Sequence, residues 1–85
     1  MFEQMNLNKY TRNLLKTQFK DMREIAKRGN IEEAIHKQWF IIGIATGLES
    51  TKTITENQRD FITKLSDRIL LRKFFPETLK KTKKH

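Results

Sequence analysis

The chain has 85 residues, which is enough for one small domain with a modest core. It contains no cysteine, which excludes disulfides and thiolate metal sites as sources of stability. Its 18 Lys and Arg residues outnumber the 10 Asp and Glu residues, and the net charge is +8. That excess predicts attraction to a polyanion such as nucleic acid, to an anionic membrane surface or to an acidic protein.

Residues 39–48 form the only uninterrupted apolar run in the sequence. A membrane-spanning helix needs about 20 apolar residues, roughly twice the length of this run, so we expect no membrane insertion. The start of the chain, residues 1–4, lacks the basic residues and the apolar stretch of a signal peptide. We therefore expect a soluble, cytoplasmic protein.

The first expected helix covers residues 7–28, where apolar residues recur at spacings of three and four. Asn6 or Asn8 is expected to cap its start, because a short side-chain oxygen accepts a hydrogen bond from a free backbone N–H. Gly29 is expected to end the helix, because glycine readily adopts the left-handed conformation that follows many helices.

The second expected helix covers residues 31–47 and contains most of the apolar run. Asn30 followed by Glu33 is close to a capping box. A helix that starts directly after Gly29 predicts a tight turn and an antiparallel hairpin of the first two helices. We expect Gly47 to end this helix. Because the run is apolar on nearly all sides, we also expect the other two helices to cover it.

Polar and β-branched residues at positions 48–55 predict a loop. The third expected helix covers residues 56–74, and the Thr-x-x-Gln pattern at 55–58 matches a capping box. Pro76 is expected to stop this helix and to open a short fourth turn at 76–80. The expected core face of the third helix consists of Phe61, Ile62, Leu65 and Ile69.

Three helices with short links predict an all-α three-helix bundle. The single helical domain is expected to span residues 1–79, followed by a basic, disordered tail at residues 80–85. The main alternative is a helix-turn-helix domain, whose turn usually has about three or four residues. The link at 48–55 is longer than that, so we favour the bundle. The small core is compatible with a monomer and with a homodimer.

Six cations recur at spacings of three and four along the first helix. At 100° per residue they fall within an arc of about 80°, opposite the apolar side. Like charges one turn apart cost about 0.2–0.5 kcal/mol per pair, which slightly favours a phosphate-contacting surface over an ordinary solvated face. The residues of this basic face are Lys9, Arg12, Lys16, Lys20, Arg23 and Lys27.

A second group of cations lies towards the end of the chain, where no acidic residue follows Glu77. Short runs of Lys and Arg are typical of nucleic-acid-binding and membrane-surface arms, and also of tails that only add solubility. In the nucleic-acid hypothesis these cations extend the binding surface. They are Arg68, Arg72, Lys73, Lys80, Lys81, Lys83 and Lys84.

Gly43 and Gly47 lie one turn apart and, with Phe40, fall along one line of the second helix. Two glycines allow another helix to approach closely. We expect a helix of the same chain to fill this line; an open line would mark a surface for a second copy or another protein. Most aromatic residues fit core positions. Phe74 and Phe75 are expected to cover the end of the core, with docking on a partner as the alternative.

Motifs for catalysis and metal binding are weak. Glu33 and His36 match half of a di-iron helix motif, but that site needs a second such pair and two more carboxylates. There is no phosphate-binding glycine loop and no nucleophile elbow. We therefore expect a protein that is not an enzyme and that uses no cofactor and no metal.

Together these patterns favour a small, basic, non-enzymatic protein that binds DNA or RNA, or has a regulatory role, through the basic face and a C-terminal lysine arm. The alternative is a protein–protein interaction module, such as an inhibitor or adaptor, whose basic charge steers it to an acidic partner. Its anchors would be Phe40, Gly43, Gly47, Phe74 and Phe75. In composition the chain is similar to accessory proteins of phages and plasmids, although no shared motif supports that analogy.

Overall fold

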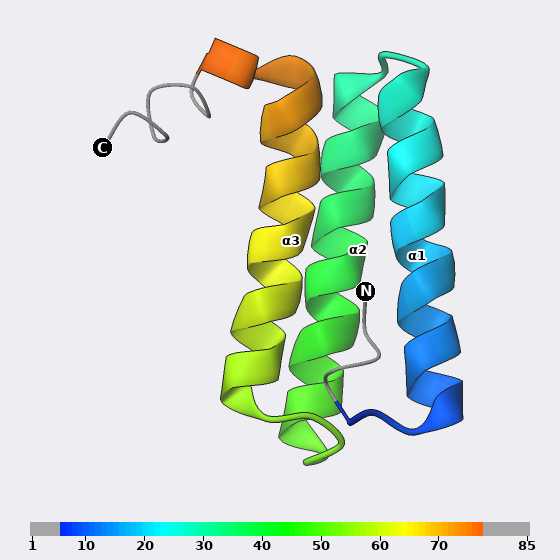
Figure 1. Ribbon diagram of the computed structural model, residues 1–85, viewed down its shortest axis with the longest axis vertical. Helices are drawn as coiled ribbons and strands as arrows, with labels where there is room; N and C mark the ends of the chain where they lie inside the picture. The colour runs from blue at the N-terminus through cyan, green and yellow to red at the C-terminus, as the bar shows by residue number, and fades with distance from the viewer. Residues whose placement is uncertain (1–5, 78–85) are drawn as a thin grey trace.

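The computed structural model describes residues 6–77, which form three α-helices. They are α1 (Lys9–Lys27), α2 (Ile31–Ser50) and α3 (Glu56–Phe74). Successive helices run in opposite directions, so that α1 and α3 are parallel to each other and antiparallel to α2 (Figure 1). The expected all-α three-helix bundle and the antiparallel hairpin of the first two helices are confirmed.

α1 begins two residues later than expected because Leu7 belongs to the segment before the helix. Asn8 is the N-cap, and its Oδ1 accepts a hydrogen bond from the backbone N–H of Thr11 at 2.8 Å. Leu7 is buried, and its carbonyl oxygen accepts a 3.0 Å hydrogen bond from the guanidinium of Arg12. At the other end of α1, Gly29 adopts the expected left-handed conformation with a φ of 79°.

α2 does not end at Gly47, as expected, but continues for three more residues. It ends in a Schellman motif, in which the N–H of Thr53 donates to the Leu48 carbonyl at 2.8 Å and the N–H of Lys52 donates to the Glu49 carbonyl at 2.9 Å. Lys52 is the left-handed residue of this motif, with a φ of 62°. The left-handed residue fixes where the helix stops, and Gly47 is not in that conformation.

The core lies between the three helices. It is closed at the end where α1 and α3 begin by Leu7 and Ile54, which come from the segments before those two helices. Ala34 and Ala45 supply small buried side chains on α2, which allow the neighbouring helices to approach closely. The large apolar side chains that are fully buried are Leu15, Phe19, Met22, Ile41 and Ile62.

One polar contact crosses the core between α2 and α3. The side-chain amide of Gln38 donates to the hydroxyl of Ser66 at 3.4 Å and also to the carboxylate of Asp67. Ser66 is fully buried, and its hydroxyl donates to the Thr63 carbonyl at 2.7 Å. A buried polar group is costly unless it is hydrogen-bonded, so this contact favours one register of α2 against α3.

One side of α2 faces solvent, contrary to the expectation that α1 and α3 cover it nearly all round. The side chains on its buried side are Ala34, Gln38, Ile41 and Ala45. Both α1 and α3 pack on this side. They leave the opposite side open, where Trp39 is 66% exposed and Phe40 is 55% exposed. Of the aromatic residues between positions 6 and 77, only Phe19 is buried, so the expectation that most of them lie in the core is also wrong.

α3 begins with the expected capping box. The N–H of Gln58 donates to the Thr55 hydroxyl at 3.1 Å, and the N–H of Thr55 donates to the Gln58 side-chain oxygen at 2.8 Å. The core face differs from the expected one at Phe61, which is 45% exposed, whereas Ser66 is fully buried. Phe61 is turned about 100° from its neighbour Ile62, and this rotation carries it past the edge of the buried side.

Pro76 and Glu77 have helical backbone conformations, which is the beginning of the turn expected at 76–80. The rest of that turn, the domain boundary expected at residue 79 and the tail at 80–85 lie outside the residues that the structure describes.

Candidate nucleic-acid interface

A groove lies between the C-terminal halves of α1 and α3, with a volume of about 640 Å³. Ala26 of α1 and Leu65 and Ile69 of α3 supply its apolar lining. Because α1 and α3 are parallel, their C-terminal ends lie at the same end of the bundle and both contribute to the groove (Figure 1). The small side chain of Ala26 leaves room between the two helices.

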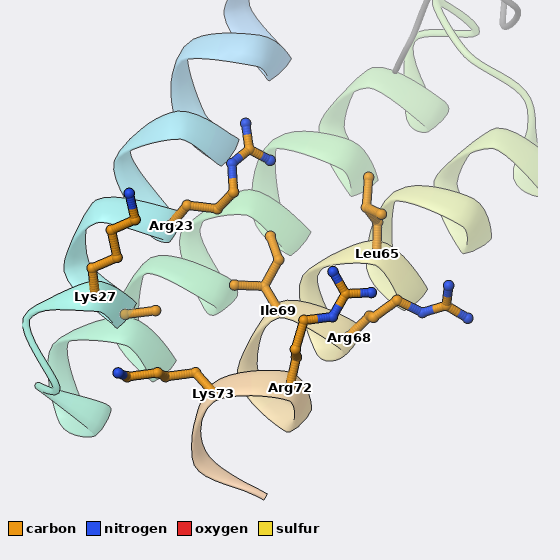
Figure 2. A pocket seen from close by; sticks show the side chains of 8 residues that line it. Arg23, Lys27, Leu65, Arg68, Ile69, Arg72 and Lys73 are labelled. Carbon is orange, nitrogen blue, oxygen red and sulfur yellow. The ribbon is translucent and has the colours of Figure 1, made fainter. Parts of the chain in front are cut away.

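Among the residues that the structure describes, every other side chain that lines this groove is a cation, and none is acidic. In Figure 2 two of these side chains extend from α1 and three from α3, on either side of the groove. We call the whole feature the basic groove. Its five cations are Arg23, Lys27, Arg68, Arg72 and Lys73.

The structure thus brings together two groups of cations that lie about 40 residues apart in the sequence. Three of these five cations have a structural role at helix ends. Lys27, Arg72 and Lys73 lie in the last turns of α1 and α3, where a cation interacts favourably with the helix dipole. Arg23 and Arg68 lie earlier in their helices, so the dipole effect does not account for their presence at the groove.

The acidic side chains that the structure describes do not neutralise these cations. Among the described residues, the ion pairs of α2 are Glu33 with Arg28 at 3.5 Å, Lys37 with Asp21 at 3.7 Å and Glu49 with Arg59, and none of them involves a groove residue. Within residues 6–77 the five cations of the basic groove form no ion pair. An apolar cavity wall beside unpaired cations raises the local positive potential and favours an anionic ligand.

The remaining cations of the basic face have different environments. Lys9, Lys16 and Lys20 are exposed along α1, on the N-terminal side of the basic groove. Arg12 is half-buried, and its hydrogen bond to Leu7 fixes the segment before α1. From Lys9 to Lys27, which lines the basic groove, the face spans about 27 Å at 1.5 Å per residue. The lysines expected to form an arm, Lys80, Lys81, Lys83 and Lys84, lie outside the described residues.

The residues expected to bind a protein partner fall into two groups. The line through Gly43 and Gly47 is open, because a Cβ atom built at either position has no neighbour within 4 Å. The expectation that another helix of the same chain fills it is therefore wrong. Phe74 is half-buried and packs against the core as expected. Phe75 is 49% exposed, so it covers the end of the core less completely than Phe74 does.

Sequence reasoning missed the apolar lining of the basic groove, because Ala26, Leu65 and Ile69 look like ordinary core positions. It also missed that Trp39 shares the exposed side of α2 with Gly43. The helical angle between these two residues was available from the sequence, since four positions apart means about 40°. What was missing was the knowledge of which side of α2 is buried.

His36 is exposed, beside Glu32 and Glu33 on the first turns of α2. In the part of the chain that the structure describes, no three side chains of His, Asp or Glu are placed to hold a metal ion. No helix in this part has the length and apolar content needed to cross a membrane.

Comparisons with protein-family models, with curated proteins and with solved structures give no match to this chain.

Proposed function

We propose that the chain is a small, non-enzymatic nucleic-acid-binding protein with a structural or regulatory role, and that the basic groove is the centre of its binding surface. The observation that carries this proposal is the meeting of five cations from two helices around one groove that no acidic residue between positions 6 and 77 lines. Phosphate contacts of this kind give affinity for DNA and RNA with little dependence on sequence.

The basic face continues the same surface along α1. A polyanion in the basic groove runs past Lys20 towards Lys9, both of which are exposed and, among residues 6–77, form no ion pair. Duplex DNA carries one charge per about 1.7 Å, so a surface about 27 Å long faces many phosphates. Arg12 contributes least, because its guanidinium already binds the Leu7 carbonyl.

The test measures the affinity of a random-sequence DNA duplex and of a single-stranded RNA by fluorescence anisotropy, in salt from 50 to 200 mM. We expect binding at 50 mM that is largely lost by 200 mM, as counterion release requires. Replacing Arg68 and Arg72 by Gln removes two phosphate contacts. The slope of log K against log salt should then become shallower by about 1.8 for duplex DNA and about 1.4 for a single strand.

A matched control separates the basic groove from net charge. The double variant Arg28→Gln, Lys52→Gln lowers the net charge of +8 by the same two units but changes no groove residue. It should keep most of the affinity and nearly the full slope. Equal losses in the two double variants would show that binding follows net charge alone, and no binding at 50 mM salt would overturn the proposed function.

The second candidate function is an interaction module for an acidic protein. The exposure of Phe40 and the open line through Gly43 and Gly47 favour it, because these residues leave one side of α2 without a covering element. In that case the variants of the basic groove would lower the association rate with the partner, since charge mainly steers the encounter.

A further inference from the structure

The exposed side of α2 is nearly free of charge, which is unusual in a chain of net charge +8. Between Glu33 and Lys52 the helix carries only Lys37 and Glu49 as charged residues. Both are half-buried at the edges of this side, and both form ion pairs within the bundle. We call the exposed, uncharged residues between them the α2 face. They are Trp39, Phe40, Gly43, Thr46 and Gly47.

The α2 face has two unlike halves. Trp39 and Phe40 project from its N-terminal half, where they are 66% and 55% exposed. Gly43 and Gly47 leave the C-terminal half flat, with nothing near the place of a Cβ atom. One half therefore carries two protruding rings, and the other half has the room to receive rings. A surface that contains both a projection and its complement can bind a second copy of itself.

One of the two rings is already held in position. The Lys37 ammonium lies 5.0 Å from the centre of the Phe40 ring and 3.7 Å from a carboxylate oxygen of Asp21. This contact restricts the ring to the edge of the α2 face before any partner binds. Restricting a side chain in advance reduces the conformational entropy that binding costs.

We propose that the α2 face binds the α2 face of a second copy, in an antiparallel, two-fold symmetric dimer. In this arrangement Trp39 of each copy lies over Gly47 of the other, and the two Gly43 residues meet at the two-fold axis. The glycines let the two helix backbones approach closely, as small residues do at helix–helix contacts. The proposal is independent of the proposed function.

Charge and shape both select the antiparallel orientation. The N-terminal end of α2 carries Glu32 and Glu33, and the left-handed residue of the Schellman motif at its other end is Lys52. With Trp39 opposite Gly47, the N-terminal end of each α2, with its two glutamates, lies at the C-terminal end of the other α2, the end that Lys52 follows. A parallel pair would instead place ring against ring and acid against acid, and like charges brought together oppose association.

The dimer also keeps the cationic surfaces apart. On α2, Lys37 faces Asp21 of α1 on one edge, and Gln38 and Glu49 face α3 on the other. The α2 face is therefore turned away from both helices, and the basic groove lies on the far side of the bundle, with α2 behind it (Figure 2). Two copies meet where neither brings its unpaired cations, which limits the electrostatic repulsion between them.

The first test is the solution mass by sedimentation equilibrium from micromolar to millimolar concentration. We expect a monomer–dimer equilibrium in the wild type. Gly43→Gln fills the flat half of the face, and because nothing lies near that position the monomer fold tolerates the longer side chain. It should raise the dimer Kd at least tenfold. The matched control is Thr17→Gln at an exposed position of α1, which should leave the Kd unchanged.

Trp39 gives a second readout because it is the only tryptophan of the chain. Its fluorescence should shift to shorter wavelength, and its quenching by acrylamide should fall, as the wild type dimerises. Neither change should occur over the same concentrations in Gly43→Gln. Circular dichroism of that variant checks that the helices are intact.

Orientation is tested by cross-linking, for which the absence of native cysteines is an advantage. His36 and Ser50 are both exposed, and in the proposed register each lies opposite the other residue of the second copy. A mixture of His36→Cys and Ser50→Cys chains should form the mixed disulfide, and each variant alone should cross-link poorly. Efficient cross-linking of each variant to itself would overturn the antiparallel arrangement.

Two further outcomes would overturn the dimer itself. The first is a wild type that stays monomeric up to about 1 mM, which corresponds to a binding free energy weaker than about 4 kcal/mol. The second is a dimer that Gly43→Gln and Thr17→Gln affect equally, which would place the interface elsewhere on the molecule.

Discussion

Two residues follow helix ends in the left-handed conformation, Gly29 after α1 and Lys52 after α2, with φ of 79° and 62°. Glycine, as at position 29, is the residue type that this backbone conformation favours, whereas a lysine, as at position 52, is not. A left-handed conformation costs a residue with a Cβ atom about 1–2 kcal/mol, and glycine avoids that cost. Lys52 therefore holds the end of α2 at some expense to the stability of the fold.

We predict that Lys52→Gly raises the free energy of unfolding by about 0.5–1 kcal/mol, after allowance for the greater freedom of glycine in the unfolded chain. Urea denaturation followed by circular dichroism measures this gain. Lys52→Ala loses the same charge but keeps a Cβ atom, so it should show no comparable gain. If both variants are stabilised equally, the effect comes from the charge and not from the backbone conformation.

Gln38 and Ser66 form the polar link that crosses the core. We predict that Gln38→Ala lowers the free energy of unfolding by about 1–3 kcal/mol, because it removes the amide that donates to Ser66 and Asp67. Combined with Ser66→Ala in a double-mutant cycle, it should show a coupling of at least about 0.5 kcal/mol. The pair of Gln38→Ala with Thr17→Ala, on the exposed side of α1, should be additive.

At the scale of elements, the starts of α2 and α3 were predictable because their signals are local, and for α1 the sequence offered Asn8 as a cap beside Asn6. Asn8, Asn30 and Thr55 each accept a hydrogen bond from the backbone three residues later. The end of α2 was not predictable in the same way. It depends on Leu48, which packs against the core and accepts hydrogen bonds from both Thr53 and Ile54. Ile54 is buried, and its tertiary contact outweighs the low helix preference of Gly47.

The larger error was the expectation that α1 and α3 cover nearly all sides of α2, and this error has a physical cause. An apolar run that includes Trp39, Phe40 and Ile41 has no helical period, so it does not indicate which side faces the core. That side is decided by the places where α1 and α3 pack. In α1, by contrast, the apolar residues repeat with the helical period, and Leu15, Phe19 and Met22 are all fully buried.

The glycines of α2 allow a prediction at the same scale. Gly43→Ala should raise the free energy of unfolding by about 0.5–1 kcal/mol, because it removes the entropic cost of a mid-helix glycine and meets no neighbour. Thermal unfolding at micromolar concentration, where the monomer dominates, measures the gain. The same substitution at Gly29 should have the opposite sign, since its φ of 79° is strained for alanine.

At the scale of the whole molecule, the cations of the basic groove could be identified from the sequence, but their convergence could not. Arg23 and Lys27 were found by their spacing on one helix, and Arg68 and Arg72 by theirs on another. Whether these pairs meet depends on the orientation of α1 and α3. The chain returns through α2, so these helices are parallel and their C-terminal halves lie side by side (Figures 1 and 2).

The opposite placement of the basic groove and the α2 face has a consequence for how copies would assemble. A dimer joined through α2 would carry its two grooves on its outer sides, facing away from each other. It would therefore bridge two separate segments of a polyanion instead of enclosing one. Copies bound to neighbouring segments of the same polyanion would be held at a high effective concentration. Even a weak contact between their α2 faces would then cross-link those segments.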